Sequence, residues 1–206
     1  GSFGNSQSYD WTSLYEDGLI YAGNSKYMVT DPPTFIEAIN ANALSGAGVV
    51  NNIYFNVGWT FPSFTDEKVA ALGTFLDNGG NMFIAGQDIG WATWGATSTY
   101  GTDSTKSFYT NYLQTNWLAD GFSANSTFTA NTTDAIFGAV SNSNIVDVYS
   151  GNLFPDELWP ATANASAIFY YNNNTAKVSG IRVDNGIYKI VYLGIGIEQI
   201  ARSEEH

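Results

Sequence analysis

Two residue types that are central to enzyme chemistry are almost missing from this chain. It contains no cysteine, and its only histidine is the last residue, His206. Without Cys or an internal His, a Ser-His-Asp triad, a Cys-His pair and the usual zinc hydrolase centre cannot be assembled. Catalysis would need carboxylates, Tyr, Lys or an oxygen-ligated metal. We therefore expect the chain not to be an enzyme, and to carry no cofactor and no metal.

Three polar side chains follow segments that indicate buried strands. Gln87 and Asp88 come after Asn81–Ala85, and Glu198 comes after Ile187–Leu193. If both segments end adjacent parallel strands, the three side chains meet at the sheet edge where ligands bind in open α/β sheets. They would then form a polar pocket for a small ligand or cation. The structural alternative is that Gln87 and Asp88 only bond the turn backbone or cap the next helix.

The same carboxylates allow a catalytic alternative. Asp88 and Glu198 would be the acid and base of a glycan hydrolase, which needs two carboxyl groups on facing positions. A separation much beyond about 10 Å would exclude that pair. If the two groups paired closely, one of them should have a raised pKa.

Aromatic residues accompany this turn. Trp91, Trp94 and Tyr100 lie in a stretch rich in Gly, Thr and Ser, and Trp59 and Phe61 follow the preceding strand. If exposed, they would form a stacking platform for sugars or a patch for a protein partner. If buried, they would only cover the end of the sheet, and we expect burial for Trp59. The predicted ligand-binding residues are Gln87, Asp88, Trp91, Trp94, Tyr100 and Glu198.

The charge balance excludes some partners. Of 206 residues, 7 are Lys or Arg and 19 are Asp or Glu, which gives a net charge of −12. Nucleic acid and anionic membrane surfaces would repel such a chain. No apolar run approaches the length of a membrane span, so we expect no membrane insertion. Few charged residues, many Asn, Ser, Thr and Gly, and no Cys are typical of an extracytoplasmic bacterial protein.

The elements that would position these residues indicate one domain over residues 3–205. Gly1-Ser2 resembles a cloning scar and His206 the remnant of a tag, and the absence of an initial Met suggests an excised domain.

The chain alternates expected helices (Phe35–Ala43, Thr65–Gly80, Ser104–Leu118) with expected strands (Asn52–Val57, Asn81–Ala85, Ile145–Tyr149, Ala167–Tyr171, Lys177–Val183, Ile187–Leu193). Helix, Gly-Gly turn and strand form a crossover that builds parallel sheets. Asp184-Asn185-Gly186 predicts a hairpin. We expect a three-layer α/β fold with a mostly parallel, flavodoxin-like sheet and a β-rich C-terminal part.

Four segments carry a resemblance to a known family. They are FLDNGGNMFIAGQDIGW (Phe75–Trp91), SFYTNYL (Ser107–Leu113), LFPDELWP (Leu153–Pro160) and YKIVYLGIGIEQI (Tyr188–Ile200). Together they resemble the class I glutamine amidotransferase-like fold over Tyr27 to Arg202. The closest likeness is to the catalytically altered versions in secreted and outer-membrane-associated proteins of Bacteroidetes. Active members have a Cys where this chain has Gln87-Asp88, and a His near the position of Glu198. The resemblance therefore implies the fold and a pocket position, but not amidotransferase chemistry.

These observations together predict a non-catalytic binding or interaction domain of a secreted or cell-surface bacterial protein. The expected partner is a glycan or a protein at the cell surface, and the domain would belong to a larger multidomain chain. Two alternatives remain open, the glycan hydrolase that uses Asp88 and Glu198 and a purely structural spacer. Burial of both Gln87 and Trp91 would favour the spacer.

Overall fold

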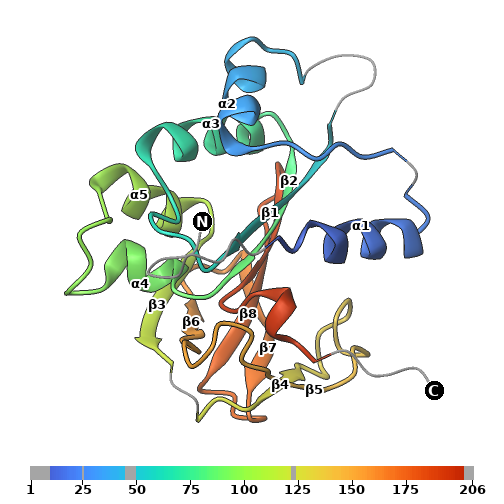
Figure 1. Ribbon diagram of the computed structural model, residues 1–206, viewed down its shortest axis with the longest axis vertical. Coiled ribbons are helices and arrows are strands. Elements are labelled where there is room, and N and C mark those ends of the chain that lie inside the picture. The colour runs from blue at the N-terminus through green and yellow to red at the C-terminus, as the bar shows by residue number, and fades with distance from the viewer. Residues whose placement is uncertain (1–9, 25, 45–49, 122–123, 202–206) are drawn as a thin grey trace.

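A single nine-stranded sheet joins the two halves of the chain in the computed structural model (Figure 1). The structure describes residues 10–24, 26–44, 50–121 and 124–201, and the strand count refers to those ranges. Both boundaries of the expected domain, residues 3 and 205, lie outside the described residues. The Gly1-Ser2 scar and His206 lie outside them as well. Along the sheet the strand order is β1-β2-β9-β8-β7-β4-β5, and β6 and β3 branch from β8.

The parallel part of the sheet follows the predicted crossover. β1 (Asn52–Gly58) leads through α3 (Asp66–Asp77) to β2 (Asn81–Gly86), and β2 pairs in parallel with both β1 and β9 (Lys189–Leu193). The side chain of Thr65 accepts a hydrogen bond from Lys68 N at 3.2 Å and so caps α3. Asp66 and Glu67 in the first turn place negative charge at the positive end of the helix dipole. The predicted helix and both strands are confirmed.

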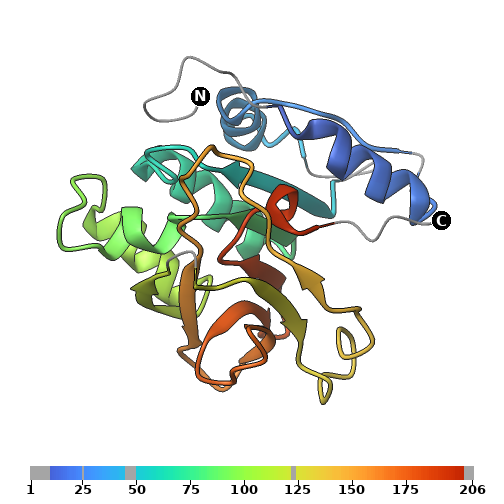
Figure 2. The same cartoon turned by 60° about the horizontal axis from the view of Figure 1, so that its bottom comes forward.

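The rest of the sheet is antiparallel, and here the fold prediction was wrong. β9 returns along β8 (Val178–Asp184) through the predicted hairpin, and β8 pairs with β7 (Ala165–Tyr171). β7 pairs with β4 (Thr127–Ala130), which pairs with β5 (Ser143–Asn144), and β6 (Asp156–Pro160) pairs with β3 (Thr115–Asp120) and with β8. Every one of these pairs is antiparallel, and among the strands of the described residues only the β1–β2 and β2–β9 pairs are parallel. The result is a mixed, curled sheet (Figure 2), not a three-layer, mostly parallel, flavodoxin-like one.

Several element boundaries also differ from the prediction. α5 (Asp103–Asn111) ends earlier than expected, because Thr115–Asp120 is strand β3 and not the end of a helix. The expected strand at Ile145–Tyr149 is reduced to β5 and one bridge from Ile145 to Ile200. α2 (Pro32–Asn40) was expected, whereas α1 (Thr12–Tyr21) and α4 (Ile89–Trp94) were not. A short 3-10 helix, η1 (Ile197–Gln199), follows β9. Among the described helices, none has both the length and the apolar composition that a bilayer crossing requires.

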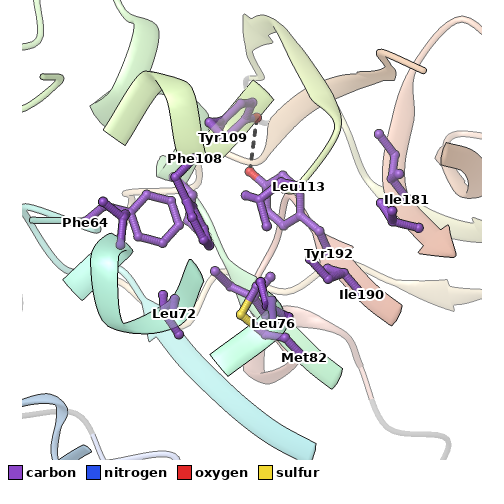
Figure 3. Packing of buried hydrophobic residues seen from close by; sticks show 14 of the residues in the cluster. Phe64, Leu72, Leu76, Met82, Phe108, Tyr109, Leu113, Ile181, Ile190 and Tyr192 are labelled. Atoms are coloured by element: carbon purple, nitrogen blue, oxygen red, sulfur yellow. Dashed lines mark hydrogen bonds between the residues drawn. The ribbon is translucent and has the colours of Figure 1, made fainter. Parts of the chain in front are cut away.

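The two faces of the sheet bury separate sets of apolar side chains. One set lies between the sheet, α3 and α5 and includes Leu72, Leu76 and Met82 (Figure 3). In it Tyr109 of α5 and Tyr192 of β9 share a hydrogen bond of 3.3 Å. On the opposite face β4, β7 and β9 contribute a second set (Phe128, Ala130, Ile168, Phe169, Tyr171, Leu193). Burial on both faces fixes the strands, and with them the turns at the strand ends.

Candidate functional site

The turn between β2 and α4 is held by close backbone packing. Asp88 has a left-handed backbone with φ of 60°. A Cβ on Gly86 would lie 2.8 Å from the carbonyl oxygen of Gly58, and one on Gly90 would lie 2.3 Å from Cδ1 of Trp117. Both distances are too short for a side chain, so the turn needs glycine at either end. It fixes the Asp88 side chain at the carboxyl end of β2.

Gln87 makes three side-chain hydrogen bonds within the protein. Its side chain is 1% exposed. Nε2 donates to the carbonyl of Asn152 at 2.8 Å, and Oε1 accepts from Phe154 N at 3.1 Å and from Gln199 Nε2 at 2.7 Å. These bonds tie the turn to the loop before β6 and to η1. The role of Gln87 is thus structural, but its partners are a distant loop and η1, not the turn backbone or the next helix that the structural alternative named.

An open cavity of about 240 Å³ lies beside Asp88. Its lining is aromatic apart from two carboxyl groups (Trp59, Phe61, Asp88, Trp91, Tyr100, Asp120, Phe154). The rings of Phe61 and Tyr100 are stacked, with centroids 5.4 Å apart and planes 13° apart. Trp91 meets the ring of Phe61 edge-on at 5.5 Å. The aromatic residues are half-buried, including Trp59, which was expected to be buried. The structure thus brings together three predicted residues, Asp88, Trp91 and Tyr100.

Trp94 does not belong to this cavity. It is 42% exposed and lies under the amino group of Lys106, which is 5.4 Å from the ring centroid. The segment expected to be a loop forms α4 over Ile89–Trp94, and this helix turns Trp91 and Trp94 to different surroundings. The predicted aromatic set is therefore divided between the cavity and the open surface.

The cavity lining contains two carboxyl groups, those of Asp88 and Asp120. Asp88 is 5% exposed, and its Oδ2 accepts a 2.7 Å hydrogen bond from Nε1 of Trp59. Asp88 and Asp120 interact through their side chains, so a shared proton is needed between them. Oδ1 of Asp120 is buried, and no donor group of the described residues reaches it. The carboxyl pair that lines the cavity therefore has an oxygen atom, Oδ1 of Asp120, that can accept a further hydrogen bond.

A third carboxyl group lies behind the pair. Asp156 is opposite Asp120 in the β3–β6 register, and it accepts hydrogen bonds from Gly90 N at 2.7 Å and Trp117 Nε1 at 2.8 Å. Burial, followed by the charges of Asp156 and Asp120, raises the pKa of Asp88 to about 8. Burial also raises the pKa of Asp156 to about 8 and raises the pKa of Asp120. Acidic side chains in this part of the fold are thus biased toward their neutral forms.

Glu198, the third polar residue predicted for the site, is hydrogen-bonded to Tyr149. It is buried, and its Oε1 accepts a 2.6 Å hydrogen bond from the hydroxyl of Tyr149. Burial raises the pKa of its carboxyl group. Glu198 does not line the cavity, but Tyr149 connects it to the cavity wall through a ring contact with Trp59 at 5.6 Å. The neighbour of Asp88 in the cavity is Asp120, not Glu198.

Sequence reasoning missed Asp120, Asp156 and Phe154. Asp156 lies in the LFPDELWP segment, but its aspartate was not singled out. Asp120 ends a strand that was taken for a helix, so no signal marked it. Within the described ranges, no set of three or more acidic, His or Cys side chains has an arrangement that could hold a metal ion.

Comparison with known proteins gives a likeness of fold. No protein-family model matches the sequence, and no curated protein matches it. The mmIFT52 N-terminal domain superposes with a TM-score of 0.51 at 12% identity, over 95% of this chain and 84% of that domain. The β-galactosidases of Bacillus circulans sp. alkalophilus and of the Antarctic haloarchaeon Halorubrum lacusprofundi give TM-scores of 0.46 and 0.40 at 10% and 13% identity. Each aligns with 73% of this chain, which spans 20% of either β-galactosidase.

These findings correct the resemblance drawn from sequence. The chain has the fold of the mmIFT52 N-terminal domain, which is not a class I amidotransferase. The mostly antiparallel sheet is also incompatible with the flavodoxin-like arrangement that the amidotransferase resemblance implied. The segment Phe75–Trp91 suggested that family because a helix, a Gly-Gly turn and a strand describe one crossover, and the crossover is present. One crossover does not determine how the remaining strands pair.

Proposed function

We propose that this chain is a non-catalytic sugar-binding domain of a secreted or cell-surface bacterial protein, and that the aromatic cavity beside Asp88 is its binding site. The observation that carries the proposal is the lining of the cavity, where five aromatic side chains surround two carboxyl groups. Ligand sites of this kind combine mostly apolar walls with a few polar groups that fix orientation. The composition of the chain supports an extracytoplasmic setting.

The chemistry of the lining suits a sugar ring. Half-buried aromatic rings offer flat apolar surfaces on which the C–H faces of a sugar can stack, at a small cost in side-chain entropy. The carboxyl oxygens of Asp88 and Asp120 can accept hydrogen bonds from sugar hydroxyls. A volume of about 240 Å³ corresponds to about eight water molecules of the bulk liquid, which leaves space for a ring-sized ligand.

The geometry supports binding more than glycan hydrolysis. The carboxyl groups of retaining and inverting glycosidases are about 5 to 9.5 Å apart, which leaves space for the scissile bond or a water. The carboxyl groups of Asp88 and Asp120 interact directly with each other, whereas either mechanism keeps space between its two carboxyl groups. The hydrolase alternative named Glu198 as the partner of Asp88, and Glu198 does not line the cavity. The structural spacer is less well supported, because Trp91 is half-buried and lines a cavity, although Gln87 is buried.

The test is a glycan array followed by calorimetric titration of the glycans that bind. Trp91→Ala and Tyr100→Ala each remove one cavity wall, and each should weaken binding by about tenfold or more, as expected for a central aromatic contact. Trp94→Ala is the matched control, because it removes a neighbouring, exposed Trp that does not line the cavity. Melting temperatures of all three variants show whether each one is folded.

Two results would overturn the proposal. One is the absence of binding to any glycan by the folded wild-type chain. The other is an equal loss of affinity in the Trp94→Ala variant and in the two cavity variants, which would move the contact away from the cavity.

A further inference from the structure

We propose that the cavity selects sugars that carry a free ammonium group, with that group bound between the carboxyls of Asp88 and Asp120. The ligand class is therefore the amino sugars, as opposed to neutral, N-acetylated or acidic sugars. The inference rests on the proposed sugar-binding function and names the substrate class of the same site.

The first support is the position of the two carboxyl groups. Trp59 Nε1 holds Oδ2 of Asp88 by a 2.7 Å hydrogen bond, so the other oxygen of that carboxyl group remains for a partner. Asp120 presents a buried Oδ1 to which no donor of the described residues is bonded. In the empty cavity the pair must share a proton, because two adjacent carboxylates do not both ionise readily. An ammonium group has three N–H donors and a positive charge, so it can replace that proton and satisfy both oxygens.

The second support is that no basic side chain of the described residues lines the cavity. Arg182 pairs with Asp134 at 2.7 Å, and Lys177 pairs with Glu157 at 2.5 Å. Lys68 donates to the carbonyl of Ser63 at 2.9 Å. The positive charge that would balance the carboxyl pair is therefore not supplied by any of these side chains, and a ligand is left to supply it.

The third support is the aromatic wall. The faces of Trp, Tyr and Phe rings attract cations, and this attraction is strongest when the cation is desolvated. The same rings stack on the apolar face of a sugar. An acidic sugar would be repelled by the carboxyl pair, and an N-acetyl group would replace three charged donors with one neutral N–H. Among sugars, only an amino sugar uses both features of the cavity.

Three trisaccharides with the same β1→4-linked backbone form the test, since they differ only in the group on carbon 2. They are the glucosamine trimer, the N-acetylglucosamine trimer and the glucose trimer. Calorimetry is performed at a pH where the free amine is protonated. We expect the glucosamine trimer to bind about ten- to a hundredfold more tightly than the other two, as for a hydrogen bond between charged groups. Asp120→Asn should reduce that preference to less than about threefold.

The proton provides a second readout. Binding of the ammonium group should release the shared proton, which is measured by repeating the titration in buffers with different ionisation enthalpies. The titratable groups that line the site are Asp88 at the start of α4, Asp120 at the end of β3 and Tyr100. Asp156 at the start of β6 does not line the site, but it interacts electrostatically with both Asp88 and Asp120. The release should be lost in both Asp120→Asn and Asp88→Asn, so the result does not depend on the folding of one variant. Asp17→Asn in α1 is the matched control, because it removes one exposed carboxylate away from the cavity and should change neither readout.

The outcomes separate this inference from the proposed function. Equal affinity for the three trimers would overturn the ammonium preference and leave sugar binding in place. Binding of a simple primary ammonium compound such as ethanolamine as tightly as the glucosamine trimer would overturn the role of the sugar ring. No binding of any trimer or array glycan would overturn both.

Discussion

The buried carboxyl groups beside the cavity make the stability of the fold depend on pH. Asp88 and Asp156 both have pKa values raised to about 8, from 3.8 for an ordinary Asp, chiefly because they are buried. A folded-state pKa above the unfolded value means that the folded protein binds more protons between the two values. The resulting stabilisation is complete below about pH 4 and is lost as the pH rises through about 8.

We therefore predict that the melting temperature of the wild-type chain falls between about pH 5 and pH 9. Asp88→Asn removes one titrating group while an amide can still accept from Trp59 and donate to Asp120, so its melting temperature should fall less steeply. Asp17→Asn serves as the control and should retain the wild-type slope. Parallel curves for the wild type and Asp88→Asn would show that the Asp88 carboxyl group is not protonated in the folded state. Differential scanning calorimetry across the pH series provides the measurement.

At Gly90, α4 packs so closely against β3 that a larger side chain would not fit. This residue lies in α4, where a Cβ would approach Trp117 of β3 to 2.3 Å. Gly90→Ala should therefore push α4 away from β3 and lower the free energy of unfolding by about 1 to 3 kcal/mol. Gly18→Ala in α1 is the matched control, because no atom lies within 4 Å of its Cβ. It should leave stability unchanged or raise it by up to about 1 kcal/mol. Denaturant titration measures both variants, and equal stabilities would contradict the packing described.

The elements with strong local signals were predictable from sequence. The helix that begins after Thr65 has a cap, an acidic first turn, an apolar stripe and a glycine stop, and the hairpin at Asp184-Asn185-Gly186 has a defined turn sequence. β3 was missed because Phe108, Tyr112 and Leu113 repeat at helical spacing into the segment that precedes it. Its pairing with β6, far along the chain, is a tertiary effect that no local pattern encodes. Three of the seven cavity residues (Asp88, Trp91, Tyr100) were predicted from the segment after β2. Asp120 was missed together with the β3–β6 pairing, and Phe154 lies in the loop just before β6.

At the scale of the whole molecule, the uneven charge should destabilise the compact state. With a net charge of −12 the folded chain repels itself, and that repulsion is screened by salt. We predict that the melting temperature at neutral pH rises as sodium chloride increases from near zero to about 0.3 M, where the screening length is well below the size of the domain. The opposing loss of ion pairs should be smaller, because the Lys189–Asp184 pair is largely exposed. A melting temperature that falls with salt would show that the ion pairs outweigh the net repulsion.

The left-handed backbone at Asp88 also limits how the site can change over evolution or by engineering. Side chains other than Gly, Asn and Asp adopt a positive φ with difficulty. Position 88 can thus carry a carboxyl group, an amide or no side chain without rebuilding the turn, and most other substitutions would disturb the scaffold as well as the cavity. The ligand charge that the cavity accepts is therefore expected to switch at this position through Asp-to-Asn exchange, a change of one functional group on an otherwise fixed frame. A redesign toward neutral ligands would begin there.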